Sequence, residues 1–370
     1  MNEYHGLILA YKAYPELGNL VTRRTAASLP VCGRYRLIDF ALSSLRNAGI
    51  TDVGIIMQRD YQSLLDHLGG GKAWDMSKRN GGLKMLPPFG LPSFHKGDYS
   101  GTMEALISVS SYIKDIPQSH VVLMTGELLA NLDLADIIKS HEESGCAITA
   151  VCANYEPDIP HHRYIVDSNG IVTQIHFDRE GKSEGLPALE CFVIDKEVLL
   201  SLMDRCKSLD LFRFSKDALT MYMNDGGKIS TYVHNTYARM IRNIEGYYDA
   251  NMNLLIENNR NALFPKDRPV RTKHAEGVST YYSSDSKAVN CLVADDCIIE
   301  GEIENCVIFP GVRIGKGSVV KNSIIMKGSV ICENVSLDCV IADKDTKFTS
   351  GVTLTGNKSL PIAVPKEAII

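Results

Sequence analysis

Short apolar runs alternate with amphipathic stretches over the first two-thirds of the chain. Four runs have the length of a buried parallel strand: residues 6–10, 52–57, 121–125 and 146–153. Between them we predict a helix over residues 38–48 that Gly49 ends, and a later helix that Asp133 caps and that ends at Gly145. Alternating strands and helices of this kind predict a Rossmann-like α/β domain with a parallel, doubly wound sheet.

From about Asn290 the apolar pattern changes to a repeat. Four similar blocks follow at steps of 15, 17 and 16 residues: Asn290-Cys-Leu-Val, Asn305-Cys-Val-Ile, Asn322-Ser-Ile-Ile and Asp338-Cys-Val-Ile. Five to six residues per short strand and three strands per coil are typical of a left-handed parallel β-helix. Cys291, Cys306 and Cys339 then take equivalent places, where we expect stacked small apolar side chains rather than metal ligands.

The stretch between the two patterns, residues 261–286, contains Pro265, Pro269 and many polar residues without clear periodicity. We therefore predict an α/β domain over residues 1–260, a linker over 261–286 and a β-helix domain over 287–370. A length of 370 residues is comfortable for two domains.

Composition narrows the class of protein. The formal net charge of -5 argues against nucleic-acid and anionic-membrane partners. The sequence has no apolar run long enough for a transmembrane helix and no signal-peptide pattern at its start. Its ten cysteines include no C-x-x-C pair, which suits free thiols in a reducing compartment. We expect a cytoplasmic protein.

Ordered blocks in both parts carry a family resemblance. They are residues 33–40 (Gly-Arg-Tyr-Arg-Leu-Ile-Asp-Phe), 41–44, 47–50, 74–75, 80–82, 86–88, 101–102, 299–301, 304–305 and 309–315. These blocks closely resemble the ADP-glucose pyrophosphorylase (glucose-1-phosphate adenylyltransferase) family. The resemblance implies a GT-A-like nucleotidyltransferase domain followed by a left-handed β-helix. It also implies a reaction of ATP with glucose 1-phosphate that gives ADP-glucose and pyrophosphate.

The nucleotide loop departs from the family's Gly-Gly-x-Gly-x-Arg-Leu pattern, although the segment from Ala10 to Gly33 keeps its length. Tyr11, Lys12 and Tyr14 stand where the glycines belong, and Glu16 stands where the arginine belongs. The tyrosines would fill the space of the phosphates, and Glu16 would repel them by roughly 4 kcal/mol at about 4 Å and an effective dielectric near 20. The family's Lys-Pro pair becomes Ala26-Ala27, so another cation is missing.

The metal and sugar motifs are also altered. Glu127 replaces the aspartate of a Gly-Asp-His motif, and Met240 replaces the second metal-binding aspartate; a thioether does not hold Mg²⁺. Arg242 replaces a glycine of that second motif and adds a charge in the place of the missing metal. Residues 188–190 (Ala-Leu-Glu) replace Ser-Met-Gly, and Arg179 or Lys182 is left as a candidate sugar-phosphate ligand. We therefore expect no catalytic residues and no bound metal or cofactor in this site.

An altered site on a kept scaffold resembles the non-catalytic, GlgD-type regulatory subunits of the family. The resemblance implies a heterotetramer with a catalytic subunit that handles Mg²⁺ and ATP, and a role in making ADP-glucose for glycogen. Arg36, Arg23 and Arg24 match the family's basic effector-binding positions, where a phosphorylated metabolite sits. Two alternatives stay open: an active adenylyltransferase with an unusual loop, and an acyltransferase on the β-helix. The second lacks a base there, since no histidine follows His274.

Overall fold

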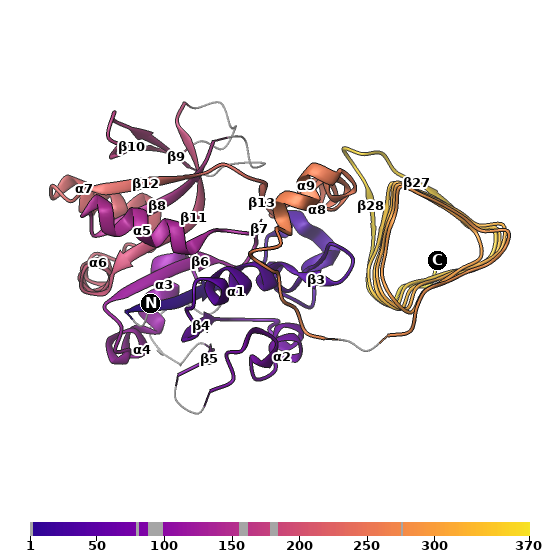
Figure 1. Ribbon diagram of the computed structural model, residues 1–370, viewed down its shortest axis with the longest axis horizontal. Helices are drawn as coiled ribbons and strands as arrows, with labels where there is room; N and C mark the ends of the chain where they lie inside the picture. Colours follow the sequence, from indigo (N-terminus) through magenta and orange to yellow (C-terminus); the bar gives the residue numbers. More distant parts are fainter. Residues whose placement is uncertain (1–2, 79–80, 88–98, 155–161, 178–183, 275–276) are drawn as a thin grey trace.

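The protein is described by a computed structural model, which covers residues 3–78, 81–87, 99–154, 162–177, 184–274 and 277–370. Figure 1 shows an α/β domain beside a triangular prism that is seen end-on. The prism is formed by the C-terminal repeats. In the part of the chain that the structure describes, no helix is long and apolar enough to span a membrane.

Among the described residues, nine strands form the central sheet of the α/β domain. Seven of them lie in the order β10-β9-β11-β6-β1-β4-β5, and β8 pairs with both β11 and β12. Their bounds are β1 Tyr4–Leu9, β4 Val53–Ile56, β5 Leu83–Leu86, β6 His120–Thr125, β8 Ile148–Ala153, β9 Arg163–Val166, β10 Val172–His176, β11 Leu186–Asp195 and β12 Ile229–His234. The four runs predicted as strands are confirmed as β1, β4, β6 and β8.

The four predicted strands are parallel to one another, whereas β10 and β11 run in the opposite direction. β1 is parallel to β4 and β6, and β12 is parallel to β8. β11, however, is antiparallel to both β6 and β8, and β10 is antiparallel to β9, so these strands, which the sequence did not predict, make the sheet mixed. A strand buried on both faces is apolar throughout whichever way it runs, so its pattern carries no direction.

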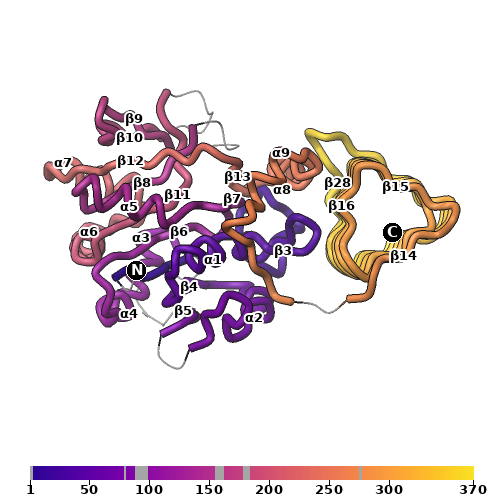
Figure 2. Tube along the Cα trace, in the orientation of Figure 1, coloured from indigo at the N-terminus to yellow at the C-terminus, as the bar shows by residue number. Residues whose placement is uncertain are grey.

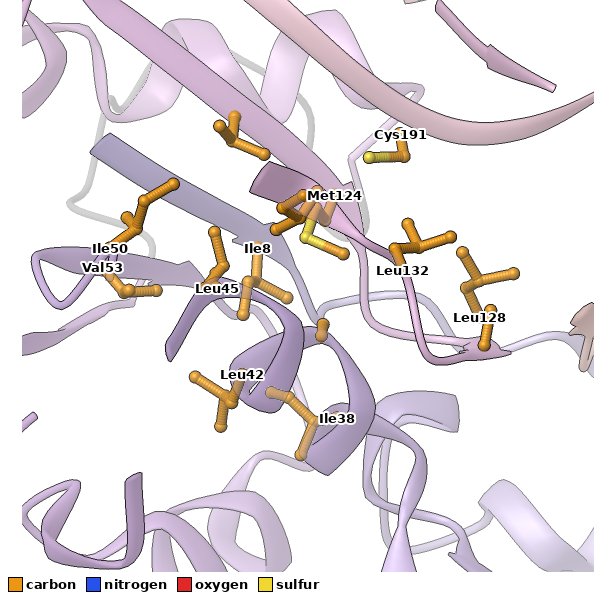
Figure 3. Close-up of a cluster of buried hydrophobic side chains, with 14 of the residues drawn as sticks. Ile8, Ile38, Leu42, Leu45, Ile50, Val53, Met124, Leu128, Leu132 and Cys191 are labelled. Atoms are coloured by element: carbon orange, nitrogen blue, oxygen red, sulfur yellow. The ribbon is translucent and has the colours of Figure 1, made fainter. Parts of the chain in front are cut away.

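Helices cover both faces of the sheet. One face packs against α1 (Leu37–Asn47), α2 (Gln62–Leu68) and α5 (Leu134–Ser144), and the other packs against α3 (Thr102–Ser108), α4 (Ser110–Asp115) and α6 (Lys196–Ser208). Figure 3 shows Ile38 and Leu42 of α1 in the first of these cores, with Ile8 of β1 and Met124 of β6. The remaining helices are α7 (Thr220–Asn224), α8 (Ile244–Met252) and α9 (Glu257–Leu263).

The two helices predicted from sequence are confirmed, together with their ends. α1 ends at Asn47, two residues before Gly49, whose φ of 79° lies in the left-handed region. At the start of α5, the side chain of Asp133 accepts a hydrogen bond from the backbone N–H of Asp136 at 3.2 Å. Gly145 ends this helix with a φ of 61°.

Residues 277–370 are described throughout, and in them three five-stranded parallel sheets form the sides of a left-handed β-helix (Figure 1). From β17 onward the strands bury residues in the interior, for example Ile299, Ile314 and Ile331, and these side chains fill the prism. The strands are β14 Tyr281–Tyr282, β15 Lys287–Val289, β16 Leu292–Val293, β17 Ile298–Ile299, β18 Glu302–Glu304, β19 Val307–Ile308, β20 Arg313–Ile314, β21 Val319–Lys321, β22 Ile324–Ile325, β23 Val330–Ile331, β24 Ser336–Asp338, β25 Val340–Ala342, β26 Lys347–Phe348, β27 Thr353–Thr355 and β28 Ile362–Val364.

The repeat register is confirmed for the first three blocks and is wrong by one residue in the fourth. Leu292 pairs with Val307, Val307 with Ile324 and Ile324 with Ile341, which are steps of 15, 17 and 17 residues. Cys339 therefore does not repeat the place of Cys306. It takes the turn position of the earlier asparagines, with a φ of 53°, and faces the α/β domain.

The asparagines that mark the repeat form a ladder along one corner of the prism. Asn290 donates to Asn305 at 2.8 Å, Asn305 to Asn322 at 3.3 Å, and Asn322 to Asp338 at 2.8 Å. All three asparagines have φ between 46° and 52°, which asparagine tolerates better than most residues. The pattern seen in the sequence thus reflects both a tight turn and a stack of side-chain hydrogen bonds.

The two domains share an apolar core. Leu17, Leu20 and Tyr248 of the α/β domain pack with Phe309 and Met326 on the outer face of the prism. The hydroxyl of Tyr248, which is 1% exposed, donates to the carbonyl of Asn322 at 2.6 Å. This buried contact fixes one side of the prism against α8.

The predicted linker includes the end of α9 and the strand β14, which already pairs with β17 in the β-helix. Its middle part runs along the outside of α1, as the orange trace below β13 shows in Figure 2. There Arg271 accepts a hydrogen bond from the indole N–H of Trp74 at 3.2 Å, and its backbone N–H donates to Ser43 at 2.8 Å. This part of the chain is therefore held against the α/β domain.

Candidate functional site

The loop after β1 and the turn after β6 lie side by side because the two strands end in register, with Leu9 opposite Thr125. This brings Lys12 to Glu127. The ammonium Nζ of Lys12 lies 3.1 Å from Oε1 of Glu127 and 2.8 Å from Oε2 of Glu190 on β11. One cation therefore bridges two carboxylates at the carboxyl ends of β1 and β6.

Arg242 closes this arrangement from the other side. It follows β13 (Ala238–Met240), which pairs with β7 (Leu128–Ala130), and its Nη2 lies 2.6 Å from Oε1 of Glu190. The guanidinium also lies 5.5 Å from the ring centre of Tyr14, a cation–π distance, and the Tyr14 hydroxyl donates to Glu127 at 2.5 Å. We call these four charged residues the loop network: Lys12, Glu127, Glu190 and Arg242. Tyr14 packs against the network.

The loop network is mostly buried and electrically balanced, with two cations and two carboxylates. Burial alone would raise the pKa of Glu190, but Arg242 and Lys12 hold it well below its usual range. Burial likewise opposes the charge on Lys12, and Glu127 and Glu190 nevertheless raise its pKa well above the ordinary value. Both groups are therefore charged in the folded protein, and neither is suited to exchange a proton near neutral pH.

Glu190 has the backbone conformation of a glycine. Its φ is 49°, and it lies in the irregular part of β11 between Ala188 and Cys191. A non-glycine residue in this region costs on the order of 1 kcal/mol. The position matches the glycine of the family's Ser-Met-Gly motif, so a charged residue here adopts a backbone conformation that glycine adopts without strain.

The structure places the other altered loop positions around this network. Tyr11 packs edge-on against Tyr99, at 5.1 Å between ring centres, and adds to the core under α3. Ala26 is fully buried, and its N–H donates to the carbonyl of Lys12 at 2.9 Å, so it shapes the loop. Glu16 is exposed in the short 3-10 helix that follows the loop and does not join the network.

Met240 and Glu127 match the family's two metal-binding aspartates. Met240 is the last residue of β13, and Glu127 directly precedes β7, the antiparallel partner of β13. Met240 is 3% exposed and packs in the hydrophobic core. Glu127 is 1% exposed on its side chain, and its Oε1 already accepts from Lys12 and Tyr14. The ammonium of Lys12 thus pairs with the carboxylates that a metal ion bridging the phosphates would need as ligands.

Sequence reasoning missed the role of Glu190 and its pairing with Arg242. A signal was present, because two glycines of the family motifs are replaced by residues of opposite charge. Arg179 and Lys182, the candidate sugar-phosphate ligands, lie outside the described residues. A cavity of about 540 Å³ borders Glu190 and is also lined by Thr102, Arg213 and Lys216.

Two of the three predicted effector arginines, Arg23 and Arg24, line a cleft between the domains, which we call the interdomain cleft, and Arg36 contacts it through Ser63. The cleft has a volume of about 220 Å³ and is lined by Asn19, Thr22, Arg23, Arg24, Ser63, Asp343, Lys344, Pro365 and Lys366. Arg24 is buried and pairs with Asp343 of the prism, whereas Arg23 is largely exposed and pairs with Glu367 at 3.3 Å. The cleft therefore joins the first 3-10 helix to the last coils of the β-helix.

Two cations on the prism side of the cleft, Lys344 and Lys366, could not be assigned from the sequence. Burial lowers the pKa of Lys344 to about 7, and Arg36 and Arg24 lower it in the same direction. Arg36 itself donates to Ser63 Oγ at 3.0 Å, and burial lowers its pKa to about 10. This arrangement concentrates positive charge at one small cleft.

Comparison with known proteins agrees with this architecture. Residues 17–176 match the nucleotidyl transferase family model, and residues 274–360 match the model of the GlmU-like C-terminal hexapeptide. The chain is 31% identical over 366 residues to glycogen biosynthesis protein GlgD of Bacillus subtilis. The aligned region covers 99% of this chain and 96% of that protein. It is 27% identical to glucose-1-phosphate adenylyltransferase of Clostridium perfringens strain 13 (89% and 84% covered), and 25% identical to that of Bacillus mycoides (96% and 95% covered).

Proposed function

This chain belongs to the glucose-1-phosphate adenylyltransferase family as a GlgD-type member, and from that premise we propose that it acts as a regulatory subunit without catalytic activity of its own. Membership of the family connects it to glycogen and ADP-glucose biosynthesis. In this proposal a catalytic subunit binds ATP and Mg²⁺ in a shared heterotetramer. The chain changes the affinity and rate of that neighbour through their interface, which is a coupling between sites.

The observation that carries the proposal is the closed loop network. Lys12 and Arg242 satisfy the carboxylates of Glu127 and Glu190 internally, so the charges that would meet Mg²⁺ and phosphates are already paired. To bind a nucleoside triphosphate in the same place, the protein would have to break these buried ion pairs. Loss of one electrostatic catalytic group alone costs on the order of 3 kcal/mol in the transition state.

Two assays test the proposal. The purified chain is incubated with ATP, Mg²⁺ and glucose 1-phosphate, and we expect no pyrophosphate above the background of a boiled sample. Pyrophosphate release without a partner would instead establish the alternative, an active adenylyltransferase with an unusual loop. The chain is then co-expressed with a catalytic relative, and we expect one mixed oligomer with kinetics that differ from those of the catalytic subunit alone.

We further propose that the interdomain cleft is where a phosphorylated effector acts. Arg23, Lys344 and Lys366 line this cleft, and Arg36 adds positive charge from behind Ser63. Guanidinium groups match the geometry of phosphate oxygens. The buried pair between Arg24 and Asp343 connects this cleft to both domains, so a bound anion would act on their junction. In the mixed oligomer, Arg36→Ala should weaken the response to an effector, and an unchanged response would remove Arg36 from the site.

A further inference from the structure

Three side chains from three separate elements meet at the end of the sheet opposite to the loop network. His120 is the first residue of β6, His141 lies in α5, and Asp195 is the last residue of β11. Nε2 of His120 lies 3.3 Å from Oδ1 of Asp195, and Nε2 of His141 lies 3.7 Å from the same atom. The three potential ligand atoms all lie within 4.8 Å of one another.

Hydroxyl groups orient both imidazole rings. Nδ1 of His141 lies 2.7 Å from the hydroxyl of Thr149, which in turn lies 2.7 Å from the hydroxyl of Ser230. Nδ1 of His120 lies 2.8 Å from the hydroxyl of Ser119, which donates to the carbonyl of Glu3. Each hydroxyl can thus pass its proton onward and accept from Nδ1–H, which leaves the lone pair of each Nε2 directed at Asp195. Metal-binding histidines have this second hydrogen bond almost always.

The carboxylate of Asp195 does not make the hydrogen bond that its place at the start of a helix would allow. Asp195 is the N-cap residue of α6, a position where an aspartate usually accepts a hydrogen bond from the first turn, but its side chain makes no such cap. It faces the two imidazoles instead. Its distances to them are longer than the roughly 2.7–2.9 Å of a charge-assisted hydrogen bond.

These spacings suit an ion at the centre of the three groups. Two nitrogen or oxygen ligands at about 2.0–2.1 Å from a tetrahedral zinc ion lie roughly 3.4 Å apart. The two histidine-to-aspartate distances of 3.3 Å and 3.7 Å are close to this value. The ligand atoms of the two histidines lie within 4.8 Å of each other, so the imidazoles would have to move closer together when an ion binds. We propose that His120, His141 and Asp195 form a binding site for a divalent transition-metal ion, best suited to Zn²⁺, with solvent in the fourth position.

The position of the site indicates a structural role. An ion there joins the start of β6, the C-terminal half of α5 and the junction of β11 with α6, which are far apart in the sequence. β6 then runs through roughly 15 Å of strand to Thr125, directly before Glu127 of the loop network. The site is thus separate from the altered nucleotide site but fixes a strand that leads to it.

Cobalt substitution tests the proposal. Tag-free, chelator-treated protein is titrated with Co²⁺, and we expect one tight equivalent whose visible bands are those of nitrogen and oxygen ligands. The protein has ten free cysteines that could bind cobalt by chance, and these would add a strong near-ultraviolet thiolate band. Binding of Zn²⁺ alone should also raise the melting temperature.

Variants make the result specific. Asp195→Asn, which changes a half-exposed side chain with little change in volume, should weaken Co²⁺ binding at least tenfold, and Thr149→Val should weaken it about tenfold through His141. His176→Ala, at a histidine on β10 outside the cluster, should bind as the wild type does. Binding that is absent in the wild type, unchanged in Asp195→Asn, or dominated by the thiolate band would each overturn the proposal. Because the side chain of Asp195 is partly exposed, Asp195→Asn tests the metal site even if a variant at the buried His141 fails to fold.

Discussion

The guanidinium of Arg242 lies 2.6 Å from the carboxylate of Glu190, and both residues stand where the motifs of the catalytic family have glycine. The pair is mostly buried, with side-chain exposures of 7% and 17%. Removing one member of a buried ion pair leaves the other charge without compensation. We therefore expect Glu190→Gln to destabilise the protein by about 3 kcal/mol, measured as the free energy of unfolding in urea.

An exposed ion pair provides the matched control. Glu367 pairs with Arg23, and both side chains are more than half exposed, so Glu367→Gln should leave the free energy of unfolding unchanged. If Glu190→Gln were as stable as the wild type, the loop network would not hold the altered site closed. In that case the main argument for a non-catalytic subunit would lose its support.

The same carboxylate makes a prediction for acid stability. Burial would raise the pKa of Glu190, but Arg242 and Lys12 lower it well below its usual range, so the unfolded chain takes up a proton first as the pH falls. Its stabilising contribution is then complete above the unfolded pKa of about 4.3 and is lost as the pH falls towards the folded value. The difference in unfolding free energy between wild type and Glu190→Gln should be constant from about pH 5.5 to 8 and shrink below about pH 4.

Urea titrations of both proteins at a series of pH values measure this difference. Glu367→Gln again serves as the reference, because its carboxylate makes only exposed pairs, with Arg23 and Lys366. A difference that grows as the pH falls would mean that Glu190 is neutral in the folded protein, contrary to the charge balance of the loop network.

The strands and helices were predictable because each depends on a local pattern. β1, β6, α1 and α5 follow from apolar runs, a capping aspartate and terminal glycines within a few residues of one another. The direction of β11 was not predictable, because a doubly buried strand is apolar whichever way it runs. The shift at Cys339 was missed because Asp338 continues the asparagine ladder although the strand register has moved by one residue.

The candidate site was predictable only in part. Resemblance to the family motifs located Lys12, Glu127 and Arg242, but not the way in which they pair. The pairing depends on Glu190 reaching two cations through the bend of β11, which is a property of the folded sheet. The interdomain cleft joins residues as far apart as Arg24 and Asp343, which are 319 positions apart, and the His120 cluster joins residues of three separate elements. No local pattern brings such residues together.

The buried pair of Arg24 and Asp343 makes a prediction for the domain junction. Both side chains are at most 6% exposed, and Arg24 also donates from Nε to the carbonyl of Leu20 at 2.7 Å. Arg24→Met should therefore destabilise the protein by about 3 kcal/mol, since Asp343 is left buried without its partner. Arg23→Met changes an exposed neighbour and should leave stability unchanged.

A double variant separates charge from packing at this junction. When Asp343→Asn is added to Arg24→Met, the uncompensated charge disappears, and we expect most of the lost stability to return. Urea unfolding compares wild type, Arg23→Met, Arg24→Met and the double variant under one condition. If the double variant were less stable than Arg24→Met alone, packing rather than charge would hold the junction.

Lys344 makes the interdomain cleft sensitive to pH. Burial, Arg36 and Arg24 lower the pKa of Lys344 to about 7, so its ammonium is formed below that pH and is lost above it. Sulfate is a suitable probe, because its charge does not change between about pH 6 and 8. Since binding an anion favours the protonated form, sulfate affinity should fall roughly threefold or more from pH 6 to 8, measured by isothermal titration calorimetry. Lys344→Met should weaken binding and remove this pH dependence, whereas Lys366→Met, at a more exposed cation of the same cleft, should weaken binding and keep it. An affinity in the wild type that does not change over this range would show that Lys344 does not contact the anion.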